Sequence, residues 1–158
     1  MVADDGMAQM TEQALTFTIE QVAAQTGLTK RTLRYYEEVG LLPPTGRTEG
    51  NYRRYTREDV TRLERIKNLR NLLGFSLADI RDILEAEDER QQIREAYRQE
   101  TEASSKITQL DHADETIRRQ LELIEQKITG LEQMRAALQA KLERHAQTRQ
   151  TLQQQKDI

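Results

Sequence analysis

The sequence predicts a mainly α-helical fold, in which a winged helix-turn-helix head is followed by a long α-helical coiled-coil arm. Two short helical patterns flank Gly27, and a stretch rich in Pro, Gly, Arg and Tyr follows them. After residue 85 there is no proline and the only glycine is Gly130, while apolar residues recur at heptad spacing. These observations predict a small compact head and an extended helix that needs a partner.

Composition supports a small core with an arm attached to it. Of the 158 residues, 36% are hydrophobic, 4% are aromatic and 32% are charged, which leaves little material for a second globular core. We therefore predict a flexible N-terminal tail (1–16), the head (17–85), a helical connector (86–109), a coiled-coil helix (110–152) and a polar C-terminal tail (153–158). The pattern leaves open whether 86–109 form a separate helix or continue into the coiled coil.

Capping signals predict where the first two helices begin and end. Thr18 followed by Gln21 is a capping-box pattern, which predicts a helix over about 19–25 that ends at Gly27. Thr29 is placed to cap a second helix, which should continue to about Glu38. Two short helices separated by a glycine turn make a helix-turn-helix.

A turn-rich stretch from residue 39 to 55 predicts a short two-stranded wing, because prolines and glycines there exclude a helix. Two further capping patterns, at Thr56 and Ser76, predict a helix ending at Gly74 and a fourth short helix after it. We expect the apolar residues of these helices to share the core with the first two. They are Val60, Leu63, Ile66, Leu69, Leu73, Leu77, Ile80, Ile83 and Leu84.

From residue 110 onward, apolar side chains repeat every three or four residues, the spacing of a seam between two helices. So hydrophilic a helix needs a partner, which predicts either a homodimer or an intramolecular hairpin. We favour the homodimer, since Gly130 is the only turn-forming residue in this stretch. The candidate dimerisation residues are Leu110, Ile117, Leu121, Ile124, Ile128, Leu131, Leu138 and Leu142; Asp114 and Arg135 interrupt the seam.

The charge distribution indicates a nucleic-acid partner for the head. The chain has a net charge of −3, yet residues 28–57 carry seven basic and three acidic side chains, a local balance of +4 that leaves −7 elsewhere. The absence of cysteine excludes disulfides and thiolate metal sites. Without an apolar span or a signal peptide, we expect a cytoplasmic protein of the nucleoid that contacts no membrane.

Two groups of residues are candidates for contacts with DNA. The first lies at the start of the second helix, the end that enters the major groove in a helix-turn-helix; we expect one of its two tyrosines to be structural. It comprises Thr29, Lys30, Arg31, Thr32, Arg34, Tyr35 and Tyr36. The second lies in the wing, where guanidinium groups suit phosphate contacts. It comprises Arg47, Asn51, Tyr52, Arg53 and Arg54, and strand alternation predicts that Arg53 and Tyr55 share one face.

An ordered series of motifs over residues 17–85 resembles the DNA-binding domain of the MerR family of bacterial transcription regulators. The motifs are TLRYYEEVGLLPP, the arginine at position 47, GNYRRYTREDV and LGFSLADI. The resemblance implies a homodimer with an antiparallel dimerisation helix, bound to a palindromic promoter site that it bends and untwists. It also implies DNA contacts by Arg31, Arg34, Tyr35, Arg47, Tyr52 and Arg53.

The sequence favours no cofactor, no metal site and no enzymatic activity. His112 and His145 lie far apart, and we interpret them as surface or seam residues rather than metal ligands. RNA polymerase and a small-molecule effector are further candidate partners that the sequence does not identify; Ile93 and Tyr97 offer an apolar spot for which a core or interface role is favoured. The alternatives are an architectural or recombination-accessory DNA-binding protein, and a coil that docks another protein.

Overall fold

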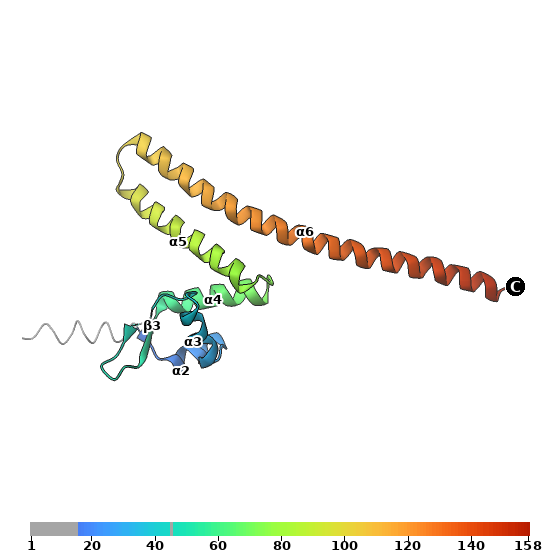
Figure 1. Cartoon of the computed structure of the whole chain (residues 1–158), viewed down its shortest axis with the longest axis horizontal. Helices are drawn as coiled ribbons and strands as arrows, with labels where there is room; N and C mark the ends of the chain where they lie inside the picture. Colours follow the sequence, from blue (N-terminus) through green and yellow to red (C-terminus); the bar gives the residue numbers. More distant parts are fainter. Residues whose placement is uncertain (1–15, 45) are drawn as a thin grey trace, which may run out of the picture. The chain divides into compact units, whose positions relative to one another are not determined.

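The computed structural model describes residues 16–44 and 46–158, so the predicted tail lies outside the described residues except for Thr16. The chain divides into two compact units, with the boundary after Leu84. Figure 1 shows the elements, which are β1 (Thr16–Phe17), α2 (Ile19–Thr26), α3 (Lys30–Glu38), β2 (Gly46–Arg47), β3 (Arg53–Thr56), α4 (Arg57–Asn71), α5 (Leu77–Gln99) and α6 (Ala103–Lys156).

The helix-turn-helix is formed by α2 and α3, with the predicted caps. Thr18 and Gln21 make a complete capping box, and Gly27 ends α2 with φ 73°, in the left-handed region that favours glycine. The Thr29 side chain accepts a hydrogen bond from the backbone N–H of Thr32 and so starts α3. Local hydrogen bonding alone therefore predicted this motif, including both of its ends.

The wing belongs to a three-stranded antiparallel sheet of order β1-β3-β2, one strand more than predicted. Thr16 pairs with Thr56 and Phe17 with Tyr55, while Arg47 pairs with Arg53. Thr16 is thus part of β1 rather than of a flexible tail. A two-residue strand has no periodicity to detect, and only its pairing with β3 defines it.

The head has one core, to which every described helix of this unit contributes. The side chains exposed by 2% or less include Val22, Leu33, Tyr36, Leu41, Leu42, Tyr55, Leu63, Ile66, Leu69, Ile80 and Leu84. Leu73 was expected in this core but is 54% exposed. The helix ends at Asn71 rather than at Gly74, so residues beyond it leave the helical face that the apolar spacing assumed.

Basic side chains of α4 and α5 hold the helix-turn-helix by hydrogen bonds to its backbone and core. Lys67 Nζ donates to the carbonyl of Thr26 at 2.7 Å, just before the turn. Arg62 Nε donates to the carbonyl of Leu41 at 2.6 Å, and Arg81 donates to that of Val39, both after α3. Arg70 Nη1 donates to the hydroxyl of Tyr36 at 3.2 Å. The bonds to Thr26 and Val39 satisfy carbonyls at the ends of α2 and α3, where no helical partner is available.

The second unit begins within α5, which continues to Gln99 instead of ending near Leu84 as predicted. No proline or glycine interrupts residues 77–99, so the helix has no local reason to stop. At residues 100–102 the chain reverses, and the Glu100 carboxylate accepts hydrogen bonds from the N–H groups of Thr101 and Glu102. These bonds hold the pKa of Glu100 below its usual value. A helix break therefore falls inside the predicted connector.

Beyond Glu85, α5 and the first part of α6 form a hairpin with polar contacts between them (Figure 1). Glu89 receives hydrogen bonds from Arg119 at 2.8 Å and pairs with His112 at 2.7 Å. The pKa of Glu89 lies below its usual value, mainly because of the hydrogen bond from Arg119 and to a smaller extent because of the one with His112. Tyr97, for which a core or interface role was favoured, has the ammonium group of Lys106 over its ring, 4.8 Å from the ring centroid.

The predicted seam lies on α6, a helix of 54 residues that runs through Gly130 without a turn. The helix α6 continues to Lys156, so it includes residues that were predicted to belong to the C-terminal tail. All eight predicted dimerisation side chains are 41–70% exposed in the single chain. No helix within the described ranges is long and apolar enough to cross a membrane.

We expect Tyr55→Phe to leave the free energy of unfolding within about 1 kcal/mol of the wild type. Tyr55 is 0% exposed, and its hydroxyl has no hydrogen-bond partner among the described residues. Tyr36→Phe removes the bond from Arg70 and should cost about 0.5–1.5 kcal/mol. Urea unfolding of both variants checks this, and a Tyr55→Phe cost above that of Tyr36→Phe would contradict it.

Alkaline titration adds a second readout for Tyr55. Burial raises the pKa of its phenol above the unfolded value, so its contribution to stability is complete below about pH 10 and is lost as the pH rises further. The Tyr55→Phe variant should therefore lose less stability than the wild type between neutral and strongly alkaline pH.

Candidate nucleic-acid interface

The outer face of α3 presents the basic and aromatic side chains that the sequence singled out. Leu33 and Tyr36 are buried, which turns Arg31, Arg34 and Tyr35 outward. Tyr35 is 46% exposed. The helix period produces this division, because apolar residues three apart face the core and the residues between them face solvent.

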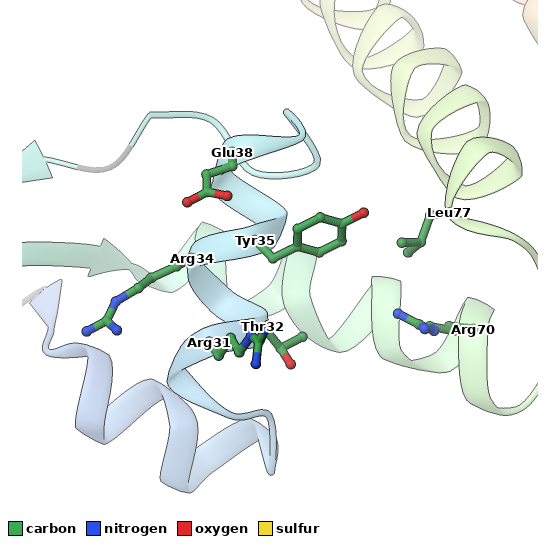
Figure 2. A pocket seen from close by; sticks show the side chains of 7 residues that line it. All are labelled: Arg31, Thr32, Arg34, Tyr35, Glu38, Arg70 and Leu77. Carbon is green, nitrogen blue, oxygen red and sulfur yellow. The ribbon is translucent and has the colours of Figure 1, made fainter.

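A depression of about 600 Å³ is lined by residues of α3, α4 and α5. Figure 2 shows Tyr35 pointing toward Leu77 and Arg70, while Arg34 extends from the opposite side of the helix. Its lining residues are Arg31, Thr32, Arg34, Tyr35, Glu38, Arg70 and Leu77. Three of them are arginines, so this surface is suited to an anionic partner.

A second depression, of about 420 Å³, lies between the wing and the start of α2. Residues from the wing, α2 and α3 line it: Thr18, Ile19, Glu20, Arg34, Thr48, Asn51, Tyr52, Arg53 and Arg54. Arg34 is common to both depressions. Arg34 thus takes part both in the depression at α3 and in the depression at the wing.

The tip of the wing is a tight turn closed by its own hydrogen bonds. The Asn51 N–H donates to the carbonyl of Thr48 at 2.8 Å, and Asn51 adopts φ 63°, a conformation that asparagine tolerates better than most residues. Arg47 Nη1 donates to the carbonyl of Asn51 at 3.2 Å. Tyr52 is 75% exposed, and its ring would lie 3.0 Å from a Cβ placed on Gly50. The turn therefore directs Tyr52 toward solvent.

Arg53 connects the wing to α3. Its Nε donates to Oε2 of Glu37 at 2.8 Å, and the two side chains are 25% and 16% exposed. Tyr55, which strand alternation predicted to share a face with Arg53, is fully buried. Arg53 was predicted to contact DNA, but its first role in the structure is to fix the wing against the recognition helix.

Three other candidates have structural roles as well. Tyr36 is 2% exposed, so we remove it from the residues that can contact DNA directly. Thr29 caps α3 and shares a hydrogen bond with the Thr32 hydroxyl at 2.9 Å. Lys30 pairs with Glu20 at 3.0 Å, and this contact holds the pKa of Glu20 below its usual value. Both side chains of that pair are well exposed, so Lys30 remains accessible.

Sequence reasoning missed the residues that reach this surface from outside α3 and the wing. Arg70 comes from the last turn of α4, Leu77 from α5, and Thr18 with Ile19 from the start of α2. From the sequence alone, an arginine in the last turn of a helix is explained by its favourable interaction with the helix dipole. Only the packing of the helices brings these residues beside α3.

Within residues 16–44 and 46–158, no three His, Cys, Asp or Glu side chains lie together in an arrangement that could bind a metal ion. Arginine, tyrosine and other polar side chains line the two depressions, and such groups serve recognition by hydrogen bonding and charge.

Comparisons with known proteins agree with this fold and surface. The family model described as MerR HTH family regulatory protein matches residues 17–87. The transcriptional regulator YfmP of Bacillus subtilis is 36% identical over 121 residues, which cover 77% of this chain and 86% of that protein. The nodulation protein NolA of Bradyrhizobium elkanii is 44% identical over 79 residues, 50% of this chain but only 36% of NolA.

A solved structure shows the same fold. It is a MerR family transcriptional regulator from Listeria monocytogenes, with a TM-score of 0.51 and 24% identity over 80% of this chain and 83% of the other. The fold and surface define the class of winged helix-turn-helix proteins. On the similarity to YfmP and to the family model, the chain belongs to the MerR family of helix-turn-helix transcriptional regulators.

We expect Arg53→Ala to lower the free energy of unfolding by about 1–3 kcal/mol, because it removes a charged partner from the largely buried Glu37. Arg31→Ala, on the exposed face of α3, serves as the control and should change stability by less than about 0.5 kcal/mol. Urea unfolding measures both. Equal stability of the two variants would show that the Arg53–Glu37 pair does not fix the wing.

Proposed function

We propose that this regulator binds a palindromic promoter site as a homodimer and distorts that site to control transcription. The observation that carries this proposal is that Arg34 lines both the depression at the exposed face of α3 and the depression beside the wing. Its membership of the MerR family supports the same conclusion.

The shape and charge of the head support docking on duplex DNA. A recognition helix enters the major groove with its N-terminal residues, where arginine can bind guanine or phosphate. Arg31, Arg34 and Tyr35 project from α3 in this way, and Arg70 extends the basic surface beside them. We assign these side chains to the major groove and to the phosphates at its edge.

The wing is suited to the adjacent phosphate backbone. Tyr52 and Arg54 line the second depression, and Arg47 lies on the neighbouring strand. Arginine makes charge-assisted hydrogen bonds to phosphate, and tyrosine adds a neutral donor. In the proposal, Arg53 supports DNA binding indirectly. Its Nε is bound to Glu37, and this contact holds the wing in place beside α3.

The exposed seam of α6 supports the homodimer. Eight large apolar side chains stay 41–70% exposed in one chain, far more apolar surface in one row than an isolated helix tolerates well. A second copy covers them and places two heads on two symmetric half-sites. Holding both heads at a set distance is also what lets such a dimer bend or untwist the DNA between them.

The remaining assignments follow from this role. We propose that the protein acts by binding alone, without catalysis, in the cytoplasm at the nucleoid, and that RNA polymerase is its partner at the promoter. The YfmP similarity favours a promoter regulator over an architectural protein. Footprinting on its own promoter, with and without candidate small molecules, tests for the effector; protection of an inverted repeat is expected, and dense unspecific protection would contradict the proposal.

Arg34→Ala should weaken binding to the palindrome and reduce the steepness of its salt dependence. Each phosphate contact contributes a slope of about −0.9 in log affinity against log salt concentration. A dimer carries two copies of Arg34, so the slope should fall in magnitude by up to about 1.8. Titrations at several salt concentrations measure this, and an unchanged slope would remove Arg34 from the phosphate contacts.

The double variant Ile124→Asp/Leu131→Asp should be monomeric and should lose binding to the full palindrome, because two charges in the seam are not compensated. Gln126→Asp/Gln133→Asp provides a matched control, with the same charges at the same spacing on the outer face of α6. Sedimentation and footprinting compare the two. Binding of a full palindrome by the monomeric variant would refute the proposal.

A further inference from the structure

The turn between α2 and α3 is organised around a buried threonine. Thr26 is 1% exposed, and its hydroxyl donates to the carbonyl of Val22 at 2.8 Å. The same hydroxyl accepts a hydrogen bond from the backbone N–H of Leu28 at 3.3 Å. Gly27, between Thr26 and Leu28, has φ 73°. The threonine side chain therefore ties the last turn of α2 to the segment that leads into α3.

A lysine of α4 holds this threonine from outside the helix-turn-helix. Lys67 Nζ donates to the carbonyl of Thr26 at 2.7 Å. Because Thr26 is the last residue of α2, its carbonyl has the partial negative charge of a helix C-terminus, for which an ammonium group is a suitable donor. The ammonium group also lies 3.8 Å from the carboxylate of Glu64, and both of these side chains are partly exposed. Exposed ion pairs contribute little, so the bond to the carbonyl is the main contact of Lys67.

Helix α4 provides a fixed position for the donor. Leu63, Ile66 and Leu69 are 0–2% exposed and anchor α4 in the core of the head. Lys67 follows Ile66 directly, so its backbone is held by that core while its ammonium group reaches the turn. A densely packed core resists displacement. Loss of the bond should therefore move the turn and the start of α3 rather than α4.

The two residues of this contact lie apart from the surface assigned to DNA. Neither Thr26 nor Lys67 is among the residues that line the two depressions at α3 and at the wing. Thr26 is buried, and the ammonium group of Lys67 is bound to a carbonyl of its own chain. Lys67 is thus a basic residue of the head that we do not assign to a phosphate.

Base contacts and phosphate contacts differ in how accurately they must be placed. A hydrogen bond to a base edge needs a donor–acceptor distance near 3 Å and a favourable angle, and such bonds determine the sequence that is bound. The attraction between a guanidinium group and a phosphate falls off slowly with distance, and it supplies most of non-specific binding. A small displacement of the start of α3 should therefore weaken base contacts more than phosphate contacts.

We propose that Lys67 and Thr26 are positioning residues for sequence recognition. Their hydrogen bonds fix the turn, and the turn sets the direction in which α3 presents Arg31 and Arg34 to the bases. Neither Lys67 nor Thr26 touches DNA in this proposal. The proposal rests on the function proposed above, and it names the contact on which the sequence specificity of that function depends.

Lys67→Met tests the contact, because it keeps an unbranched side chain and removes the donor. The full-length variant is titrated with the promoter duplex that footprinting protects and with a duplex of the same length and composition in scrambled order. Affinity for the promoter duplex should fall about tenfold or more, as expected for a lost base contact. Affinity for the scrambled duplex should change by less than about twofold, and the salt dependence should keep its slope, since no phosphate contact is lost.

Equal weakening of both duplexes, or no weakening of either, would overturn the proposal. Equal weakening together with a slope reduced by up to about 1.8 would identify Lys67 as a phosphate contact in each of two copies. Loss of folded protein also weakens both duplexes equally, so the ratio of the two affinities separates positioning from a general loss of stability.

Two further variants of this contact distinguish its parts. Lys67→Arg keeps a donor for the carbonyl and should recover most of the lost specificity. Glu64→Gln removes the ion pair at 3.8 Å and leaves the bond to Thr26 in place, so it should keep the wild-type ratio of the two affinities. If Glu64→Gln reproduces the loss, the ion pair rather than the carbonyl bond holds the turn, and the proposal is wrong.

A second pair of variants tests the threonine. Thr26→Val replaces the hydroxyl by a methyl group of similar size, whereas Thr26→Ser keeps the hydroxyl. The ratio of promoter to scrambled affinity should fall in Thr26→Val and stay near the wild-type value in Thr26→Ser. An equal fall in both variants would show that the methyl group of Thr26, rather than its hydroxyl, is what matters, and it would contradict the proposal.

Amide hydrogen exchange measures the turn without DNA. In Lys67→Met the N–H of Leu28 should exchange faster than in the wild type, while the amides of α4 around Leu63 and Ile66 should keep their protection. Unchanged exchange at Leu28 would refute the role of Lys67 in the turn. By contrast, a wild-type chain that binds the promoter and scrambled duplexes equally would refute the proposed function, whatever the exchange at Leu28.

Discussion

The orientation of the recognition helix depends on a small set of hydrogen bonds from basic side chains to backbone carbonyls. Lys67 and Arg62 donate from α4 to the carbonyls of Thr26 and Leu41, one on each side of α3. Leu33 and Tyr36 anchor the same helix from its buried face. With the core face and both ends held, α3 has one way to present Arg31 and Arg34. Rigid presentation is what a recognition surface requires.

The same constraint divides the arginines and lysines of the head into two groups. Lys67 and Arg62 use their charge within the protein, and Arg53 uses it to hold the wing against Glu37. Arg31, Arg34 and Arg54 line the two depressions. The local excess of positive charge in residues 28–57 thus includes one side chain, Arg53, whose Nε is already bound to Glu37. A chain with a net charge of −3 can nevertheless bind DNA, because accessible cations are concentrated around these depressions.

The second unit shows how one helix can have two partners. The start of α6 packs against α5 through polar contacts centred on Glu89, while the seam side chains stay 41–70% exposed. The two options left open by the heptad pattern, a hairpin and a homodimer, are therefore compatible. The α5–α6 interface is polar, so a second copy gains little apolar contact by displacing α5. The apolar seam is the surface that a second copy can bury.

The sequence by itself determined the local features of this protein. Caps at Thr18, Thr29 and Thr56, the glycine that ends α2 and the seam on α6 follow from hydrogen bonds and periodicities between residues close along the chain. Those features predicted the helix-turn-helix, the wing and the arm, and with the motifs they predicted the family. Expectations about helix ends were less accurate where no proline or glycine marked the boundary, as at Leu84 and at residues 100–102.

Only the tertiary structure decided which residues reach the surface together. It paired β1 with β3, buried Tyr36 while leaving Tyr35 exposed, joined Arg53 to Glu37 and brought Arg70 beside α3. Each of these depends on contacts between segments that are distant in sequence. Local sequence patterns do not predict such contacts. Whether an arginine binds a phosphate or a carbonyl of its own chain depends on what packing places within its reach, and that is settled only when the core forms.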